Sequence, residues 1–129
     1  MTESNDISAA QIDELLRFLP LLDKPGHDFI QKWHGGGSQF PYPVYEPVVE
    51  HFIAAAGQTH WLDFGYQPQQ AGEMLYDDSV LSAADLPTIK TMLTFVVRGE
   101  RFGDGHWGSL LQNGRIVALL KRLETIRTE

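Results

Sequence analysis

The segment Ile89–Gly108, IKTMLTFVVRGERFGDGHWG, joins an apolar run directly to a group of charged residues and glycines. In its first half, apolar residues recur every three or four positions, which predicts a helix. They cover most of the helix circumference, so we expect this helix at the centre of the fold. Its N-cap is Ser82 or Asp85, and Pro87 fits in the first turn, where no amide hydrogen is needed. The apolar positions are Ile89, Met92, Leu93, Val96 and Val97.

Four other segments show the same helical spacing. The first follows Ser8 and Gln11, a capping-box pair, and contains Pro20, which favours an early end. The second has Pro47 in its first turn and ends at Gly57. The apolar stripes are Ile12, Leu15, Leu16, Leu19 and Leu22; Tyr45, Val48, Val49, Phe52, Ile53 and Ala56; Ala71, Met74 and Leu75 within Gln69–Tyr76; and Ile116, Leu119, Leu120, Leu123 and Ile126.

The stretch Asp23–Tyr42 separates the first two of these helices and contains prolines and a triple glycine. A structureless loop of about twenty residues would be unusual in a compact domain. We expect a short helix here, and the alternative is a small hairpin that involves Trp61–Tyr66. The helix reading uses the spacing of Phe29, Ile30 and Trp33, and the strand reading uses the alternation of Phe29, Gln31 and Trp33.

These patterns predict a mainly α fold, a compact single domain of about five helices, with one short β-hairpin as the alternative for the glycine-rich stretch. A chain of 129 residues is long enough to bury about two-thirds of the surface of its unfolded form in one core. Residues 1–129 are therefore expected to form a single globular domain. Residues 1–7 are polar and acidic, and we expect them to be a disordered tail.

Composition excludes several classes of function. The chain has no cysteine, which rules out disulfides, thiolate metal ligands and a cysteine nucleophile. Its 17 acidic and 10 basic residues argue against nucleic-acid binding, because Lys121, Arg122 and Arg127 form the only basic group. The first residues do not resemble a secretory signal, and no run is long enough to cross a membrane. We therefore expect a cytoplasmic protein that binds no membrane.

The charged group at Arg98–Gly108 is the main candidate for function. If the central helix continues past Arg98, its core stripe reaches Glu100, which would then point inward. Gly99 and Gly103 allow a sharp turn, after which Asp104 can cap a helix that begins near His106.

Two interpretations of this group remain open. In the structural one, Arg98 and Arg101 pair with acidic residues, Asp104 is a cap and Trp107 lies in the core. In the functional one, the candidates for proton transfer are Glu100, Asp104 and His106, and the ligand-binding candidates are Arg98, Arg101 and Trp107.

Other motifs are weaker. The histidines show no zinc-binding spacing, although Asp104 with His106, or His60 with Asp63, can contribute to a site assembled in space. We therefore predict no metal and no cofactor. The aromatic residues near loops are expected to fill the core, and the alternative is a concave pocket or a partner groove. They are Trp33, Phe40, Tyr42, Tyr45, Trp61, Phe64, Tyr66 and Trp107.

The carboxyl half, Trp61–Leu123, resembles a family of small prokaryotic proteins classed as a domain of unknown function. The residues that carry the resemblance are KTMLTFVVRGERFGDGHW and the upstream WLDFGYQPQQAGEMLYD. The resemblance implies an independent domain and assigns no activity, ligand or catalytic residue.

No complete catalytic constellation can be assembled from these residues, so whether the protein is an enzyme stays open. The first hypothesis is a binding or regulatory module that recognises a protein, a second copy of itself or a small ligand. The second is an enzyme that acts on an anionic substrate, for which a phosphate-bearing compound is one option, through the Arg98–Trp107 cluster. An architectural subunit is the third.

Overall fold

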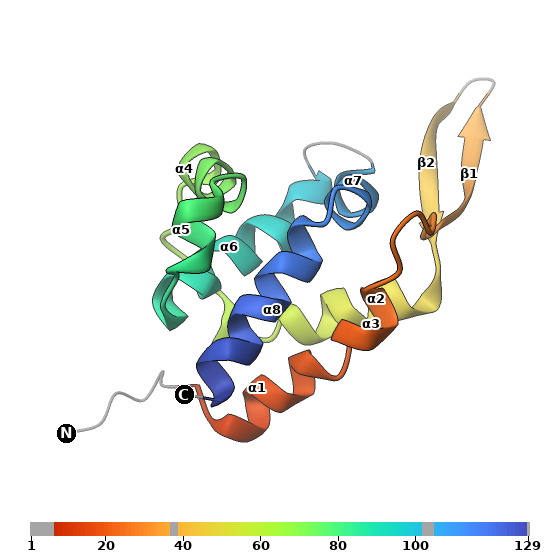
Figure 1. The fold of residues 1–129 in the computed structure, drawn as a ribbon. Helices are drawn as coiled ribbons and strands as arrows, with labels where there is room; N and C mark the ends of the chain where they lie inside the picture. The colour runs from red at the N-terminus through yellow and green to blue at the C-terminus, as the bar shows by residue number, and fades with distance from the viewer. Residues whose placement is uncertain (1–6, 37–38, 102–104, 129) are drawn as a thin grey trace.

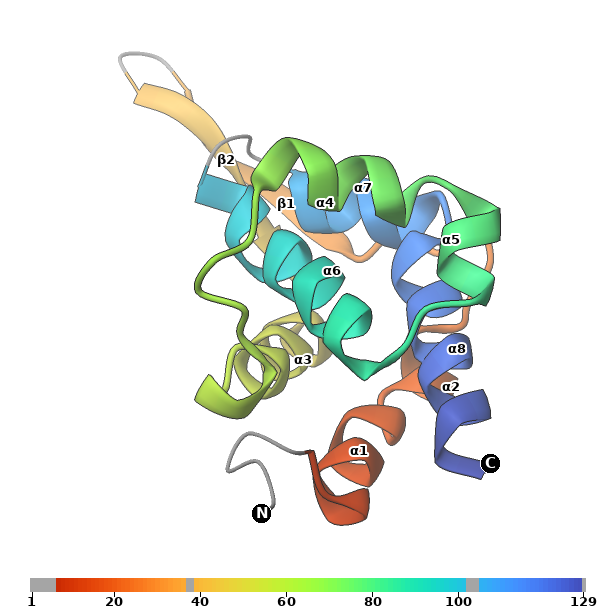
Figure 2. The ribbon, with the colours of Figure 1, turned by 90° about the vertical axis from the view of Figure 1, so that its left-hand side faces the viewer.

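The computed structural model describes the backbone of residues 7–36, 39–101 and 105–128, and the side chains of 7–33, 35, 43–100 and 105–128. The chain is mainly helical, as the sequence predicted, and it contains a two-stranded antiparallel hairpin, which was the alternative for the glycine-rich stretch (Figure 1). The helices pack into one body, and the hairpin extends away from it (Figures 1 and 2). The expected tail, residues 1–7, lies mostly outside the described residues, and Ile7 packs against the core.

The predicted first helix is divided in two. Helix α1 spans Ala9–Leu16 and α2 spans Leu19–Leu22, with Pro20 in its first turn. The capping box is present, since the Ser8 hydroxyl accepts from the Gln11 amide at 3.1 Å and the Gln11 side chain accepts from the Ser8 amide at 2.9 Å. Pro20 therefore ends the first helix early and is accommodated at the start of the second.

The glycine-rich stretch forms the hairpin, and the prediction of a short helix there was wrong. Strand β1, Ile30–Gly36, pairs antiparallel with β2, Gln39–Tyr45. The expected partner, Trp61–Tyr66, contributes no strand, because the chain forms a short 3-10 helix, η1, at Thr59–Trp61 and then a loop. The hairpin partners are thus neighbours in sequence, joined across the glycines.

A bulge in β1 sets which side chains face the helical body. Ile30 is opposite Tyr45 and Lys32 is opposite Val44, so β1 has one residue more than β2 over this interval. An extra residue reverses the alternation of side chains along the strand. Ile30 and Trp33 differ by three positions and would lie on opposite faces of a regular strand. Because of the bulge, both side chains approach the helical body.

Strand β2 contains two prolines at alternate positions, Pro41 and Pro43. Successive amide groups of a strand point to opposite edges, so both missing donors belong to the same edge. In a two-stranded sheet one edge of β2 needs no partner, which is why the prolines are tolerated. They also make that edge a poor template for pairing with another chain.

The next three helices begin as their capping residues and prolines dictate. Pro47 and Pro68 each occupy the first turn of their helix. A short helix that the sequence pattern did not predict follows, and the carboxylate of Asp77 caps it by accepting from the amides of Ser79 and Val80. The bounds are Pro47–Ala56 for α3, Pro68–Leu75 for α4 and Asp78–Ser82 for α5.

Helix α6, Leu86–Arg98, is the central element, as predicted. Asp85 caps it by accepting from the Thr88 amide at 3.0 Å. The helix contacts α3, α4, α7 and α8, and Figure 2 shows it surrounded by the other helices. Helix α7 spans His106–Gln112 and α8 spans Arg115–Thr128. The residues of α6 with at most 1% exposure are Ile89, Met92, Leu93, Thr94 and Val96.

Thr94 is the polar residue buried in the described part of this core. Its hydroxyl accepts a hydrogen bond from the amide of Asp63 at 2.8 Å and donates one to the carbonyl of Lys90 at 2.8 Å. The first of these bonds fixes the loop after η1 to the central helix. Because the threonine satisfies an amide that would otherwise lack a partner, its burial is compatible with stability.

Candidate functional site

The carboxylate of Glu100 lies at the junction between α6 and α7. It belongs to a turn of 3-10 helix, η2, at Gly99–Arg101 that follows α6 directly. One oxygen accepts from the amide of Gly105 at 2.8 Å and the other from the amide of Trp107 at 3.0 Å. The first amides of a helix have no partner within the helix, so Glu100 caps α7 from outside. The cap residue itself, Gly105, has φ of +89°, which favours glycine.

Tyr45, at the end of β2, completes this network. Its hydroxyl lies 3.0 and 3.1 Å from the two oxygens of Glu100 and accepts from the amide of Gly108 at 3.1 Å. Its ring packs against that of Trp107, with the centroids 5.3 Å apart, and the Trp107 indole donates to the carbonyl of Val96 at 2.8 Å. These contacts connect the base of the hairpin with η2 and α7, and they connect α7 with α6.

His106 lies beside this network in a cavity that a glycine creates. Its ring packs edge-on against Phe95 with a centroid distance of 4.9 Å, and its Nε2 atom is buried without a described partner. Burial lowers the pKa of His106, while the Phe95 backbone and the charge of Glu100 act in the opposite direction. A Cβ at Gly99 would lie 2.1 Å from Nε2, so only glycine leaves room for the imidazole.

Arg98 lies apart from the acidic group. Its guanidinium packs over two rings of the loop before α4, 5.6 Å from the centroid of Phe64 and 5.8 Å from that of Tyr66. Among the described residues it makes no ion pair with a carboxylate. The side chain of Arg101 and all of Asp104 lie outside the described residues.

The structure thus brings three of the predicted site residues together: Glu100, His106 and Trp107. Glu100 points inward, as the helical stripe predicted, and its contacts are those of a helix cap. A role in proton transfer for Glu100, Asp104 or His106 stays a prediction, as does ligand binding by Arg98, Arg101 and Trp107.

The described residues contain no group of three histidine, aspartate or glutamate side chains that could hold a metal ion. At the suggested pair, both oxygens of Asp63 are engaged, one by the Gly65 amide at 3.0 Å and the other by the Thr91 hydroxyl at 2.7 Å. His60 packs near Trp61, with ring centroids 5.8 Å apart.

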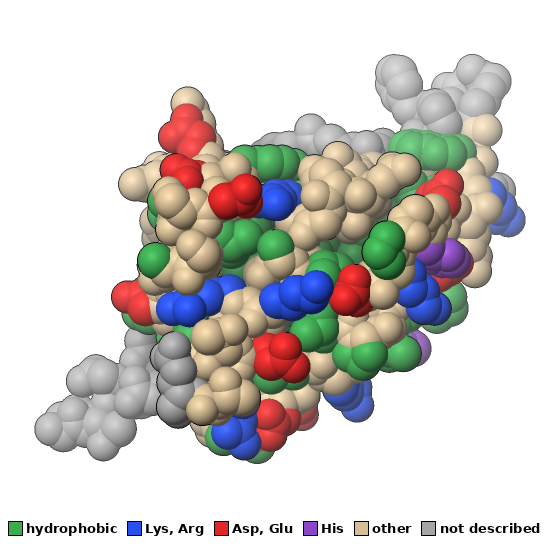
Figure 3. All heavy atoms as spheres, in the orientation of Figure 1, with side chains coloured by type: hydrophobic (Ala, Val, Ile, Leu, Met, Phe, Trp, Pro, Cys, Tyr) green, Lys and Arg blue, Asp and Glu red, His purple; other side chains and the backbone are tan. Residues whose placement is uncertain are grey.

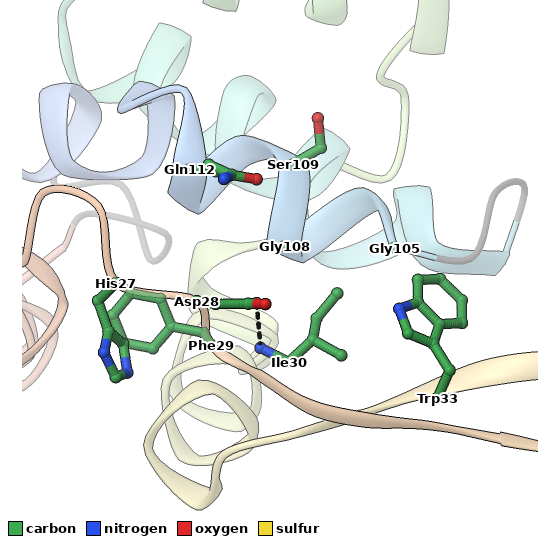
Figure 4. A pocket seen from close by; sticks show the side chains of 9 residues that line it. All are labelled: His27, Asp28, Phe29, Ile30, Trp33, Gly105, Gly108, Ser109 and Gln112. Atoms are coloured by element: carbon green, nitrogen blue, oxygen red, sulfur yellow. Dashed lines mark hydrogen bonds between the residues drawn. The ribbon is translucent and has the colours of Figure 1, made fainter.

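A pocket of about 260 Å³ lies between β1 and α7, next to the Glu100 network, and the sequence patterns did not locate it. Figure 4 shows α7 as one wall and the start of β1 as the other, with Ile30 between Asp28 at one end and Trp33 at the other. Trp33 is 52% exposed although it is a large aromatic residue. The lining residues are His27, Asp28, Phe29, Ile30, Trp33, Gly105, Gly108, Ser109 and Gln112.

Two glycines of α7 allow this pocket to form. A Cβ at Gly108 would lie 2.9 Å from the Ile30 side chain, and one at Gly105 would lie 3.3 Å from the Trp33 ring. The helix therefore approaches the strand closely at both points. In the sequence, only Gly105, Gly108 and Trp33 hint at this pocket. The bulge in β1, which the sequence does not reveal, places Ile30 and Trp33 opposite the two glycines.

The charged groups of the pocket are acidic or neutralised. Asp28 accepts from the Ile30 amide at 3.0 Å through one carboxylate oxygen. His27 contacts both oxygens of Glu46 at 3.0 Å. No lysine or arginine is among the described lining residues.

Elsewhere the surface mixes both signs of charge. Figure 3 shows basic and acidic side chains interspersed on the face that carries α8. There Lys121 lies 3.5 Å from Asp23, Arg127 lies 3.0 Å from Asp13, and the Arg122 side chain donates to a backbone carbonyl at 2.8 Å. No helix in the described ranges has the length and apolar character needed to cross a bilayer.

Comparison with known proteins identifies the family of this chain. The model of a family of unknown function, DUF6508, matches residues 7–129, so the resemblance seen in the carboxyl half is part of a longer one. No curated protein and no solved structure matches the chain significantly. Because the match covers almost the whole sequence, the chain belongs to DUF6508, a family of unknown function.

Proposed function

We propose that this protein is a binding module and that its ligand or partner occupies the pocket between β1 and α7. The observation that carries the proposal is the exposed ring of Trp33, which stands at one end of the pocket. Exposed tryptophans are expensive to hydrate and are enriched at binding hot spots. A bound ligand or partner would cover this ring, which accounts for its exposure in the free protein.

The pocket has the mixed character typical of recognition sites. Ile30 supplies an apolar floor, Asp28 supplies a carboxylate beside the start of β1, and Gln112 supplies an amide from α7. Its volume of about 260 Å³ is below the usual range of about 300–1,000 Å³ for pockets that bind drug-sized molecules. It therefore suits one side chain of a partner or a ligand of similar size better than a nucleotide.

The Glu100 network supports a scaffolding role beneath this pocket. Its hydrogen bonds fix Gly105 and Gly108, two residues of the α7 wall, and its tyrosine lies at the base of the hairpin. A binding site held by secondary structure and by a charged cap is rigid before the ligand arrives, which lowers the entropic cost of binding.

The test is a nuclear magnetic resonance screen of the ¹⁵N-labelled protein with a set of neutral, cationic and anionic fragments. We expect the shifted signals to cluster on the Trp33 indole and on the amides of Ile30, Gly105, Gly108 and Ser109. Trp33→Ala should abolish these shifts. Phe64→Ala is the matched control, because Phe64 is also an exposed aromatic residue, at 68%, but does not line the pocket. Fragments that bind only elsewhere, or no binding fragment at all, would contradict the proposal.

A further inference from the structure

The charges of the pocket point to the chemistry of its occupant. Resting on the proposed function, we infer that the pocket receives the side chain of an arginine or lysine carried by an extended segment of a partner protein. The carboxylate of Asp28 would contact the cation, and the exposed ring of Trp33 would contact the apolar stem of the same side chain.

Asp28 retains the capacity to bind a cation. Its Oδ1 atom accepts from the Ile30 amide, which fixes the carboxylate in place, and Oδ2 has no partner among the described residues. Figure 4 shows the carboxylate pointing into the space between β1 and α7. An oriented carboxylate with a free oxygen matches the donors of a guanidinium or ammonium group.

Trp33 provides the second contact. The indole ring offers a large apolar surface against which the methylene stem of an arginine or lysine can pack. Its far edge is held near Gly105, and about half of its surface is open to solvent. Asp28 and Trp33 lie at opposite ends of the pocket, so a long, flexible side chain such as that of arginine or lysine fits with its cationic end at Asp28 and its apolar stem over Ile30 toward Trp33.

The surrounding charges also favour a cation over an anion. The described lining contains no basic residue except His27, which is bound to Glu46, and the whole chain has a formal net charge of −7. Lys32 is adjacent to Trp33 in the strand, and alternation places its side chain on the opposite face. The amides of Gly105 and Trp107 donate to Glu100 and that of Gly108 donates to Tyr45, so these three are not available to an anionic ligand.

An extended segment is the favoured carrier because β1 is an edge strand. It pairs with β2 on one side and with no other strand in the described part of the chain. Such an edge can accept an added strand, in which backbone hydrogen bonds give affinity and a side-chain pocket gives specificity. The hairpin also projects from the helical body, where a second protein can reach it (Figure 1).

The experiment compares two peptides that differ only in charge: Ac-Gly-Thr-Arg-Thr-Gly-NH2 and the same peptide with citrulline in place of arginine. Each is titrated into the full chain while the Trp33 indole signal is followed. We expect the arginine peptide to bind about three-fold more tightly, the effect of one exposed charge pair. Raising the salt concentration from about 0.05 to about 0.5 M should reduce that preference.

Asp28→Asn is the matching variant, since asparagine keeps the acceptor for the Ile30 amide and removes the charge. It should bring the two peptides to similar affinity. The control Glu50→Gln removes an acidic charge from an exposed position of α3 outside the pocket and should keep the preference.

Each remaining outcome counts against the inference in a distinct way. Equal binding of both peptides in the pocket would overturn the cationic occupant and leave the binding module standing. Saturable binding of free N-acetyl-arginine amide as tight as that of the peptide would overturn the extended segment. If neither peptide nor any fragment shifts the pocket signals, the proposed function fails as well.

Discussion

The hydroxyl of Tyr45 lies 3.0 and 3.1 Å from the two carboxylate oxygens of Glu100, although 55 positions separate the two residues in the sequence. The same carboxylate accepts from two amides at the start of α7, and the same hydroxyl accepts from a third. Hydrogen bonds to a charged acceptor are stronger than neutral ones. This pair therefore holds the end of the hairpin, the end of α6 and the start of α7 in one arrangement.

Glu100→Gln should lower the free energy of unfolding by about 2–3 kcal/mol, because the amide keeps one acceptor oxygen and turns donors toward the backbone amides. Tyr45→Phe should cost about 1–2 kcal/mol. Urea denaturation of the single and double variants measures both. The double variant should lose about 1 kcal/mol less than the sum, since both single changes remove the same contact.

Glu50→Gln, at an exposed position of α3, is the control and should change stability by less than about 0.5 kcal/mol. If the losses from Glu100→Gln and Tyr45→Phe add fully, the hydroxyl and the carboxylate do not interact in solution.

The inward direction of Glu100 followed from the sequence, but its partners did not. The stripe that contains Ile89, Leu93 and Val96 continues at the same spacing onto position 100, which is why the helical pattern sufficed for direction. Tyr45 was assigned to the helical stripe after it, because the apolar spacing runs on without a break into α3. A contact between residues so far apart depends on the packing of the hairpin base, which no local pattern encodes.

Gly99→Ala should destabilise the fold by about 1–3 kcal/mol, because the added Cβ would lie 2.1 Å from Nε2 of His106. The backbone at Gly99 has φ of −65°, so alanine meets no conformational penalty there. The cost is therefore steric and should disappear when the ring is removed. In the His106→Ala background, Gly99→Ala should be neutral or stabilising, as thermal unfolding of the four proteins would show.

Gly65→Ala serves as the comparison, since the nearest atom to its Cβ would be an ordinary 3.7 Å away. An equal cost of Gly99→Ala with and without the imidazole would mean that the ring does not occupy this cavity.

The lowered pKa of His106 predicts a dependence of stability on pH. Above the ordinary histidine pKa of 6.5 both the folded and the unfolded chain carry a neutral ring, and the stability is complete. As the pH falls below that value, the unfolded chain binds a proton that the folded chain does not, so stability decreases. Urea unfolding between about pH 7.5 and about pH 5.5 should show a smaller decrease for His106→Phe than for the wild type.

The contributions of the other histidines are common to both proteins and cancel when the variant is compared with the wild type. His51→Gln, at an exposed position, should keep the full decrease. A His106→Phe protein with the pH dependence of the wild type would show that burial does not hold this ring neutral.

The pocket depends on a feature that the sequence hides. Without the bulge, Ile30 and Trp33 would lie on opposite faces of β1, and no alternation places both against α7. The bulge also explains why the spacing at Phe29–Trp33 resembled that of a helix, since it places two residues three positions apart on the same face of the strand. Pro41 and Pro43 lie within β2, and its edge position accommodates their missing amide hydrogens. The long helices were predictable because each buries one face, which places apolar residues at regular intervals in the sequence.

Thr94→Val should cost about 1–3 kcal/mol, although the two side chains have nearly the same shape. The buried hydroxyl of Thr94 accepts a hydrogen bond from the Asp63 amide, and valine would leave that amide without a partner. Thr125→Val is the matched control, because Thr125 also donates to the carbonyl four residues earlier, at 3.2 Å, but is exposed and accepts from no described amide. It should change the free energy of unfolding by less than about 0.5 kcal/mol.

Hydrogen exchange adds a local measurement, since the Asp63 amide should exchange faster in Thr94→Val than global unfolding alone predicts. Equal stability of the two variants would show that water replaces the hydroxyl at this loop, and that the loop is not fixed to α6 by this bond.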